Sequence, residues 1–443
     1  MKVTHLNGAC EVIESNGVKI LLDPWLVDGE YYGSWCAYPP LEDFDFSLLN
    51  DIDFIYISHI HPDHLSKLTL EKLNKDIPVL IHNFPEKFVK ANIESLGFKV
   101  RELDSGKKTH LKNNVYIDIF SAGYCNPEFC CKSFGCGKME FDYTSTTIDT
   151  LCVISDDDYH ILNVNDCPYP VAQYAVDKVL KKYKNIDLLM MGYTGASAYP
   201  QCFDNYSMEE KIENGRRQKD YYFTSGLNFI KHVRPKHFMP MAGTYVLGGS
   251  LAAIEKYRAV NDIHETYLKY NTLSPSEGIL LNTGESFDLP SQKQSKRYEP
   301  VDPVERDAYL KDTLRFKKYD FEDDEEPSID DLKDLCSKSW LRFNKKREEL
   351  NLSSDTHIYI YLNDKYAARF PFNGKAYEIV DISPAKAEKN ISFRVNPKLL
   401  KRLLMGPRYA HWNNAEIGCH IIYYRNPDIY ERGLHYCMNF FHA

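Results

Sequence analysis

The segment that most limits how this chain can fold is the loop 58–64, which reads SHIHPDH. It follows directly on the run 54–57 (FIYI), which has the composition of a buried β-strand. Three histidines and a carboxylate at the mouth of a strand are the ligand types that borderline divalent metals favour. Isolated histidines rarely gather at such a strand exit, so a solvated turn is the poorer interpretation. The loop therefore predicts a metal site at the end of a β-strand.

The spacing inside the loop assigns its four polar side chains to two metal ions. On an extended segment, His59 and His61 point the same way and can hold one metal ion. Asp63 and His64 then turn toward a second ion. The loop alone thus predicts four ligands for two neighbouring divalent metals.

Two carboxylates at other predicted strand ends complete the site. The apolar run 161–164 is followed by Asp166, which can bridge two metals. The alternative is that Asp166 caps a helix that begins near Pro168. Asp23 ends the run 18–22, where it can accept the second N–H of a ligand histidine and fix its tautomer.

The histidine loop resembles the signature of the metallo-β-lactamase superfamily. The resemblance implies an α/β fold, the αββα sandwich, and the order of elements is compatible with it: a hairpin over 12–23, then alternating strands and helices up to residue 191. Hydrolases of this superfamily supply two more histidines, but the corresponding stretches 121–124 and 240–244 contain none. We therefore expect a more open site, which suits oxygen chemistry at iron as well as hydrolysis at zinc.

Further segments resemble the catalytic region of the CMP-N-acetylneuraminate hydroxylases. They are 7–10 (NGAC), 23–26 (DPWL), 55–65, 161–167 (ILNVNDC), 189–197 (LMMGYTGAS), 240–243 (PMAG) and 426–430 (NPDIY). The resemblance implies an iron-dependent monooxygenase that acts on a nucleotide-linked sugar and is reduced by a Rieske cluster. That family carries its Rieske domain ahead of this region, and the chain has no Cys-x-His…Cys-x-x-His pair. We expect electrons from a separate Rieske or ferredoxin-type protein, unless the chain no longer oxygenates anything.

The length of the chain and the change in its composition after residue 290 predict two domains. The chain has 443 residues, which exceeds the usual size of one domain. We assign 1–290 to the metal domain, 291–331 to a polar linker with the acidic run 322–326, and 332–443 to a smaller C-terminal α+β domain.

Composition narrows the partners and the compartment. The net charge of −9 argues against a general nucleic-acid surface. The N-terminus has no signal-peptide core, and no apolar run approaches the ~20 residues of a membrane span. We therefore expect a cytoplasmic protein with reduced thiols. Four cysteines have a spacing that matches neither a zinc knuckle nor a common iron–sulfur pattern, so structural thiols are favoured over a metal cluster: Cys125, Cys130, Cys131 and Cys136.

The substrate pocket is less clear from sequence. Backbone N–H groups of the small-residue loop 192–197 can meet a phosphate or carboxylate, although a plain tight turn explains it equally well. Tyr193, Ser197 and Tyr245 are the predicted substrate-binding residues at the pocket rim. The segment 411–414 (HWNN) either reads a sugar or base edge or packs at a domain interface.

Three functions from different classes fit these residues. In the first, a pair of iron ions activates oxygen to hydroxylate a sugar or nucleotide-sugar. In the second, metal-bound hydroxide attacks a phosphodiester, amide or lactone, and zinc is the alternative metal. In the third, a binding or scaffold subunit keeps a vestigial site. The intact ligand set disfavours the third and the missing histidines favour the first, with Asp63 and Asp166 as the catalytic carboxylates.

Overall fold

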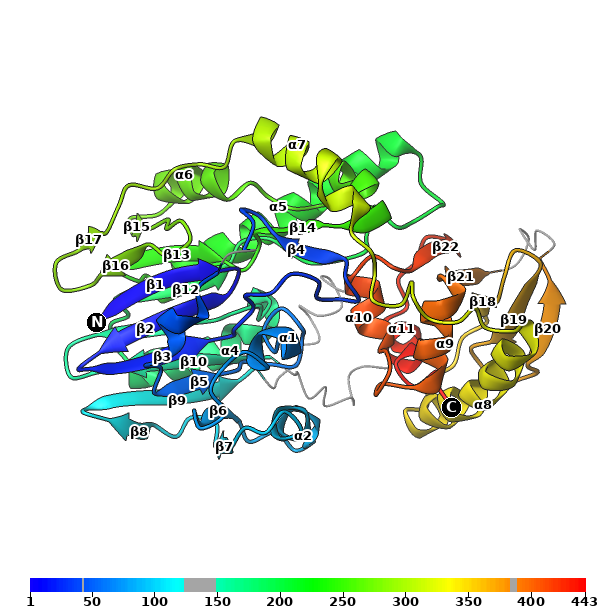
Figure 1. Ribbon diagram of the computed structural model, residues 1–443, viewed down its shortest axis with the longest axis horizontal. Helices are drawn as coiled ribbons and strands as arrows, with labels where there is room; N and C mark the ends of the chain where they lie inside the picture. Colours follow the sequence, from blue (N-terminus) through cyan, green and yellow to red (C-terminus); the bar gives the residue numbers. More distant parts are fainter. Residues whose placement is uncertain (42–43, 123–148, 383–388) are drawn as a thin grey trace.

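The computed structural model describes residues 1–41, 44–122, 149–382 and 389–443. Figure 1 shows a larger part, coloured blue through green to the yellow of α7 (Pro303–Asp312), beside a smaller part, coloured yellow to red. The histidine loop belongs to the larger part, and the chain ends in the smaller one.

Two mixed β-sheets build the larger part. The first runs, from edge to edge, through β17 (Lys293–Gln294), β16 (Ser286–Asp288), β1 (Lys2–Asn7), β2 (Cys10–Ser15), β3 (Val18–Leu22), β5 (Phe54–Tyr56), β6 (Val79–His82) and β7 (Val100–Leu103). The second runs through β15 (Glu277–Gly278), β13 (His237–Met241), β12 (Leu188–Gly192), β11 (His160–Asn163), β10 (Thr150–Ser155), β9 (Val115–Ser121) and β8 (Thr109–Lys112).

Alternation along the strands explains how the sheets stack. In β12, Leu188 and Met190 belong to the buried cluster shared by both sheets, whereas Leu189 and Met191 belong to the cluster on the opposite face. Successive side chains of a strand point to opposite faces, so a strand buried on both sides is apolar throughout. Each sheet therefore has one face in a common core and one face under helices.

Helices cover the two outer faces. The second sheet is covered by α4 (Tyr169–Lys182), α5 (Met208–Val233) and α6 (Ile263–Leu273), and the first by α1 (Lys67–Leu70) and α2 (Phe88–Glu94). The predicted αββα sandwich is thereby confirmed.

Strand direction gathers the predicted ligands. The predicted hairpin is present as β2 and β3, joined through Asn16 and Gly17 at φ of 49° and 69°. β3 and β5 pair in parallel, so Asp23 and the histidine loop leave the sheet at the same edge. β11 brings Asp166 to the corresponding edge of the second sheet.

The smaller part has its own five-stranded sheet. Its order is β20 (Glu378–Asp381), β19 (Tyr366–Pro371), β18 (His357–Tyr361), β21 (Asn390–Arg394) and β22 (Ile422–Asn426). It packs with α8 (Ile329–Glu349), α9 (Pro397–Met405), α10 (Trp412–Ile417) and α11 (Arg432–Met438). We refer to residues 332–443 as the C-terminal domain. A smaller α+β unit was expected here, and both helices and strands are present.

The segment 291–331 carries more structure than a solvated linker implies. It contains β17, α7 (Pro303–Asp312) and the 3-10 helix η4 (Leu314–Phe316). Tyr319 and Phe321 are buried in one apolar cluster with Trp35 of the larger part and Phe343 of α8. The segment thus contributes to the contact between the two parts, while the domain limits at 290 and 331 stay predictions. No helix in the described portion of the chain is long and apolar enough to cross a membrane.

Candidate metal centre

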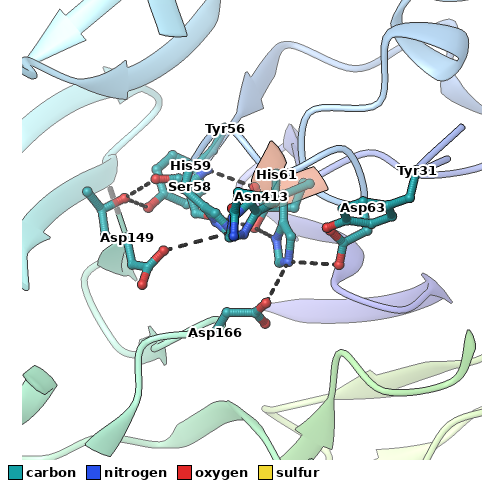
Figure 2. Close-up of polar contacts among 12 residues, drawn as sticks. Tyr31, Tyr56, Ser58, His59, His61, Asp63, Asp149, Asp166 and Asn413 are labelled. Carbon is teal, nitrogen blue, oxygen red and sulfur yellow. Dashed lines mark hydrogen bonds and ion pairs between the residues drawn. The ribbon is translucent and has the colours of Figure 1, made fainter. Parts of the chain in front are cut away.

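Three predicted ligands converge where the two sheets meet. One ligand atom each from His59, His64 and Asp166 lies within 4.8 Å of the others. Both histidines are fully buried. Figure 2 shows His59, from the loop after β5, and Asp166 approaching from the opposite sheet. The structure therefore brings together residues that are about a hundred positions apart in the sequence.

His59 and His61 form the first half of the site. His59 Nε2 lies 2.9 Å from His61 Nδ1 and 3.9 Å from Asp149 Oδ1. Two nitrogens that bind one ion at about 2.1 Å each stand about 3 Å apart, so the spacing fits a shared metal. Burial, together with the nearby His64 and His61, lowers the pKa of His59 well below its usual value. A neutral imidazole is the form that binds a metal.

His64 and two carboxylates form the second half. His64 Nε2 lies 3.4 Å from Asp63 Oδ2 and 3.3 Å from Asp166 Oδ2. Within the described residues, this buried nitrogen has no hydrogen-bond partner. Burial lowers the pKa of His64, but the carboxylates of Asp166, Asp63 and Asp23 outweigh burial and raise it well above its usual value. A cation at this point satisfies both the orphaned nitrogen and the clustered carboxylates.

Asp23 fixes which nitrogen each histidine presents. Its Oδ2 lies 3.0 Å from His64 Nδ1, which donates to it, so Nε2 faces the centre. The same carboxylate accepts from the Ser58 N–H at 2.7 Å and the Ser58 hydroxyl at 2.8 Å. Since that hydroxyl proton is committed, Ser58 Oγ accepts from His59 Nδ1 at 2.9 Å and leaves His59 Nε2 free. Asp23 thus occupies the predicted supporting position, in contact with His64 directly and with His59 through Ser58.

Tyr31 supports the remaining loop carboxylate. Its buried hydroxyl donates to Asp63 Oδ1, which leaves Oδ2 to face His64. Burial raises the pKa of Tyr31 well above its usual value, so the phenol stays a donor. Burial alone would raise the pKa of Asp63, but the nearby His64 and the Tyr31 hydrogen bond hold it below its usual value, in the anionic form that binds metals.

Asp149 is the member of the cluster that the sequence reasoning missed. The metallo-β-lactamase resemblance predicts a metal ligand from the middle of the domain at 121–124, and Ser121 ends β9 there. Asp149 instead precedes Thr150, which pairs with Ser121 across β9 and β10, so it lies at the same sheet edge on the neighbouring strand. The available signal was a carboxylate directly before an apolar strand.

The alternative role considered for Asp166 does not match the structure. The N-cap of α4 is Pro168, with no side-chain hydrogen bond from a capping residue. The Asp166 carboxylate points at His64 instead. The candidate centre therefore has two halves, one with His59, His61 and Asp149, and one with Asp63, His64 and Asp166.

A cavity of about 230 Å³ opens beside both halves. Its wall combines aromatic side chains with the backbone of the small-residue loop: Trp25, Trp35, Tyr222, Tyr245, Gly192, Thr194, Gly195 and Ala196. Trp35 and Tyr245 stack at 3.3 Å between ring centroids. A ring-shaped or sugar-like group can pack against such a wall while its reacting atom faces the metals.

The predicted rim residues occupy three different places. Tyr245 lines the cavity, as proposed from sequence. Ser197 lines a small neighbouring cavity and its hydroxyl accepts from the Tyr199 N–H. Tyr193 is buried, and its ring lies where a side chain on Gly243 would stand. Substrate binding by these three residues stays a prediction.

Two other predicted features have different outcomes. The four cysteines between Cys125 and Cys136 lie outside the described residues.

In the segment 411–414, Trp412 is buried and donates to the Phe441 carbonyl, while Asn413 Oδ1 lies 3.0 Å from His61 Nε2. Of the two interpretations of this segment, the structure matches packing between domains.

Part of the chain is similar to known proteins. A family model described as a beta-lactamase superfamily domain matches residues 2–125. A putative Rieske 2Fe-2S iron-sulfur protein of Mycolicibacterium smegmatis is 30% identical over 249 residues, 55% of this chain and 43% of the relative. Cytidine monophosphate-N-acetylneuraminic acid hydroxylase of Macaca mulatta is 26% identical over 333 residues, 72% of this chain and 51% of the relative. These matches confirm both resemblances, and the chain spans about half the length of the curated relatives it matches.

Solved structures with a similar fold have low sequence identity. The isothiocyanate hydrolase from Delia radicum gut bacteria is 15% identical, with a TM-score of 0.45 over 65% of this chain and 99% of that one. CmlA, a diiron beta-hydroxylase from Streptomyces venezuelae, is 15% identical, with a TM-score of 0.42 over 64% and 53%.

Replacing Asp149 should remove one metal ion. We expect Asp149→Ala to lower the content from about two ions per chain to about one, because the His59–His61 pair loses its carboxylate. Elemental analysis after loading with a single divalent metal measures this. Asp158→Ala, at an exposed carboxylate on the turn after β10, is the matched control and should keep both ions. An unchanged metal content in Asp149→Ala would remove Asp149 from the ligand set.

Glu30 makes the stability of the metal-free protein depend on pH. Burial raises its pKa from 4.5 to about 8, although the Ser66 hydroxyl, 2.5 Å from Oε1, opposes the shift. The unfolded chain ionises this group at lower pH than the folded chain, so the stabilising contribution is complete below about pH 4.5 and is lost as pH rises to about 8.

The Glu30→Gln variant should escape that loss. We expect it to match the wild type in acid and to exceed it by roughly 5 kcal/mol in free energy of unfolding above pH 8. Urea unfolding of the metal-free proteins across this range measures the difference. Parallel stability profiles for the two proteins would show that Glu30 is ionised in the folded state at neutral pH.

Proposed function

We propose that this chain, whose N-terminal part is a metallo-β-lactamase superfamily domain, is an iron-dependent hydroxylase with two metal ions. Its substrate is a sugar or nucleotide-sugar, and its electrons come from a separate Rieske or ferredoxin-type protein. The observation that carries the proposal is the position of His59 Nε2, which lies 2.9 Å from His61 Nδ1 and 3.9 Å from Asp149 Oδ1. Two histidines and one carboxylate are the ligand set of non-haem iron(II) oxygenases, which leaves coordination positions open.

The second half of the centre agrees with iron chemistry. His64 is joined there by two carboxylates, so the six candidate ligands include three carboxylates and no thiolate. Carboxylates and imidazoles suit iron, whereas thiolates would have favoured zinc or iron–sulfur clusters. Three negative charges also compensate most of the charge of two divalent ions in a buried site.

The similar proteins also support a hydroxylase. A hydroxylase of CMP-N-acetylneuraminic acid is similar over 72% of this chain, and the other relative reported above is named for a Rieske iron–sulfur cluster. A nucleotide-sugar substrate and an electron-donating partner are therefore the natural candidates for this chain as well.

The residues around the centre hold the ligands in place and orient the substrate. Bound iron would supply the reduction of dioxygen when electrons arrive. Asp23 and Ser58 hold the imidazoles in one tautomer, and Tyr31 keeps Asp63 oriented, so the ligands need no rearrangement during turnover. The Trp35–Tyr245 wall orients the substrate ring and excludes water from the reacting face.

The proposal is tested by following oxygen atoms. The metal-free protein is loaded with iron(II) or with zinc(II) and given CMP-N-acetylneuraminate, reduced ferredoxin and isotopically labelled dioxygen. We expect the iron form to consume dioxygen and to place label in the product, and Asp166→Ala to abolish both. A reduced iron form that consumes no dioxygen contradicts the proposal. A zinc form that cleaves phosphodiester, amide or lactone probes with oxygen from water would establish the hydrolase instead.

A further inference from the structure

We propose that the C-terminal domain is part of the metal centre, where Asn413 positions His61 and His420 positions Asp63 through Tyr31. The inference rests on the proposed ligand roles of His61 and Asp63 and does not depend on which reaction the metals perform. It makes metal affinity a property of both domains together.

Asn413 reaches the histidine loop directly. Its Oδ1 lies 3.0 Å from His61 Nε2, across 352 positions of sequence (Figure 2). His61 presents Nδ1 toward His59 Nε2, at the first metal position, so its proton belongs on Nε2. An amide oxygen can only accept, which means that Asn413 selects the tautomer in which Nδ1 is free for a metal. Asn413 is thus a positioning residue for His61, as Asp23 is for His64.

Asn413 is itself held in place. It is the second residue of α10, and its backbone N–H donates to the ring of the N-cap residue His411 at 3.3 Å. Tyr32 of the larger part accepts from the His411 N–H at 2.7 Å. The neighbouring Trp412 is buried, and its Nε1 donates to the Phe441 carbonyl at 2.8 Å. The amide is therefore presented by a rigid helix start, as precise positioning of a ligand requires.

His420 acts on the second half of the centre through Tyr31. Its Nε2 donates to the Tyr31 carbonyl at 2.8 Å. Tyr31 has a φ of 52°, an unusual conformation for a residue with a side chain, and this hydrogen bond helps to hold it. In that conformation the Tyr31 hydroxyl donates to Asp63. The C-terminal domain thus contacts a ligand of one proposed ion directly and reaches a ligand of the other through Tyr31.

The domain contact is substantial enough to support this role. Trp35 Nε1 donates to the Ile417 carbonyl at 3.3 Å, and one buried apolar cluster includes Trp25, Tyr31 and Trp35 together with Trp412 and Ala415 of α10. Tyr31 belongs to this cluster and also supports Asp63, so docking of the domain and binding of the metals depend on a common residue. By thermodynamic linkage, each should then strengthen the other.

The contact between Asn413 and His61 is tested in the metal-free protein that contains both domains. Zinc(II) is titrated against a competing chelator, which separates the two binding steps. We expect Asn413→Ala to weaken one ion by about 10- to 100-fold, a typical effect of losing a partner of a ligand histidine. Asn413→Asp keeps an accepting oxygen and should restore affinity to within a few-fold. Arg408→Ala, at an exposed residue shortly before α10, should bind both ions like the wild type.

The contact through Tyr31 has its own variants. His420→Ala removes the hydrogen bond from the C-terminal domain to the Tyr31 carbonyl, and Tyr31→Phe removes only the hydroxyl that reaches Asp63. We expect each variant to weaken the other ion while the Asn413-dependent ion keeps its affinity. If Asn413→Ala does not fold, as judged by the thermal unfolding of the metal-free protein, Asn413→Leu takes its place, because it removes the accepting oxygen at nearly unchanged side-chain volume.

Two negative results are distinguishable. Folded Asn413→Ala and Tyr31→Phe proteins that bind both ions with wild-type affinity overturn this inference and leave the proposed function standing. A wild-type chain that binds no metal removes the proposed function itself.

Discussion

The buried carboxylate of Asp23 is the contact on which the rest of the centre depends. It lies where β3 and β5 leave the first sheet, fully buried, and it accepts from the Ser58 N–H, the Ser58 hydroxyl and His64. Burial raises its pKa, while His64 and the hydrogen bonds from Ser58 act in the opposite direction. A buried carboxylate is tolerated only with such partners. Because the same contacts set the tautomers of two histidines, the cost of burying Asp23 is linked to the metal geometry.

The ligands and the residues that position them belong to elements that the fold brings together from three directions. The histidine loop and Asp23 come from the first sheet, Asp149 and Asp166 from the second, and Asn413 from the C-terminal domain. Neither sheet alone holds both halves of the centre. The cavity lies along this junction, so a substrate held by the Trp35–Tyr245 wall meets ligands from both sheets at once.

Features that depend on a few neighbouring residues could be predicted from the sequence. The hairpin around Asn16 and Gly17 and the histidine loop could both be predicted, because turn chemistry and ligand spacing operate over a few residues. Asp166 could be found because it follows a strand in the same way as the histidine loop does.

Asp149 and Asn413 could not be predicted because their roles depend on pairing between distant segments. Asp149 is recognisable only once Thr150 is known to pair with Ser121. Asn413 meets His61 only after the C-terminal domain has docked. The buried aromatic residues of 291–331 were missed for a related reason: the acidic run 322–326 dominates the local composition, whereas the burial of Tyr319 and Phe321 is set by tertiary contacts.

The most direct test of the account is anomalous diffraction from crystals of the full chain loaded with iron under anaerobic conditions. The account predicts two peaks, one bounded by His59, His61 and Asp149 and the other by Asp63, His64 and Asp166, with Asn413 still against the outer nitrogen of His61. A centre that stays empty under saturating iron, or peaks bound by other residues, would contradict it.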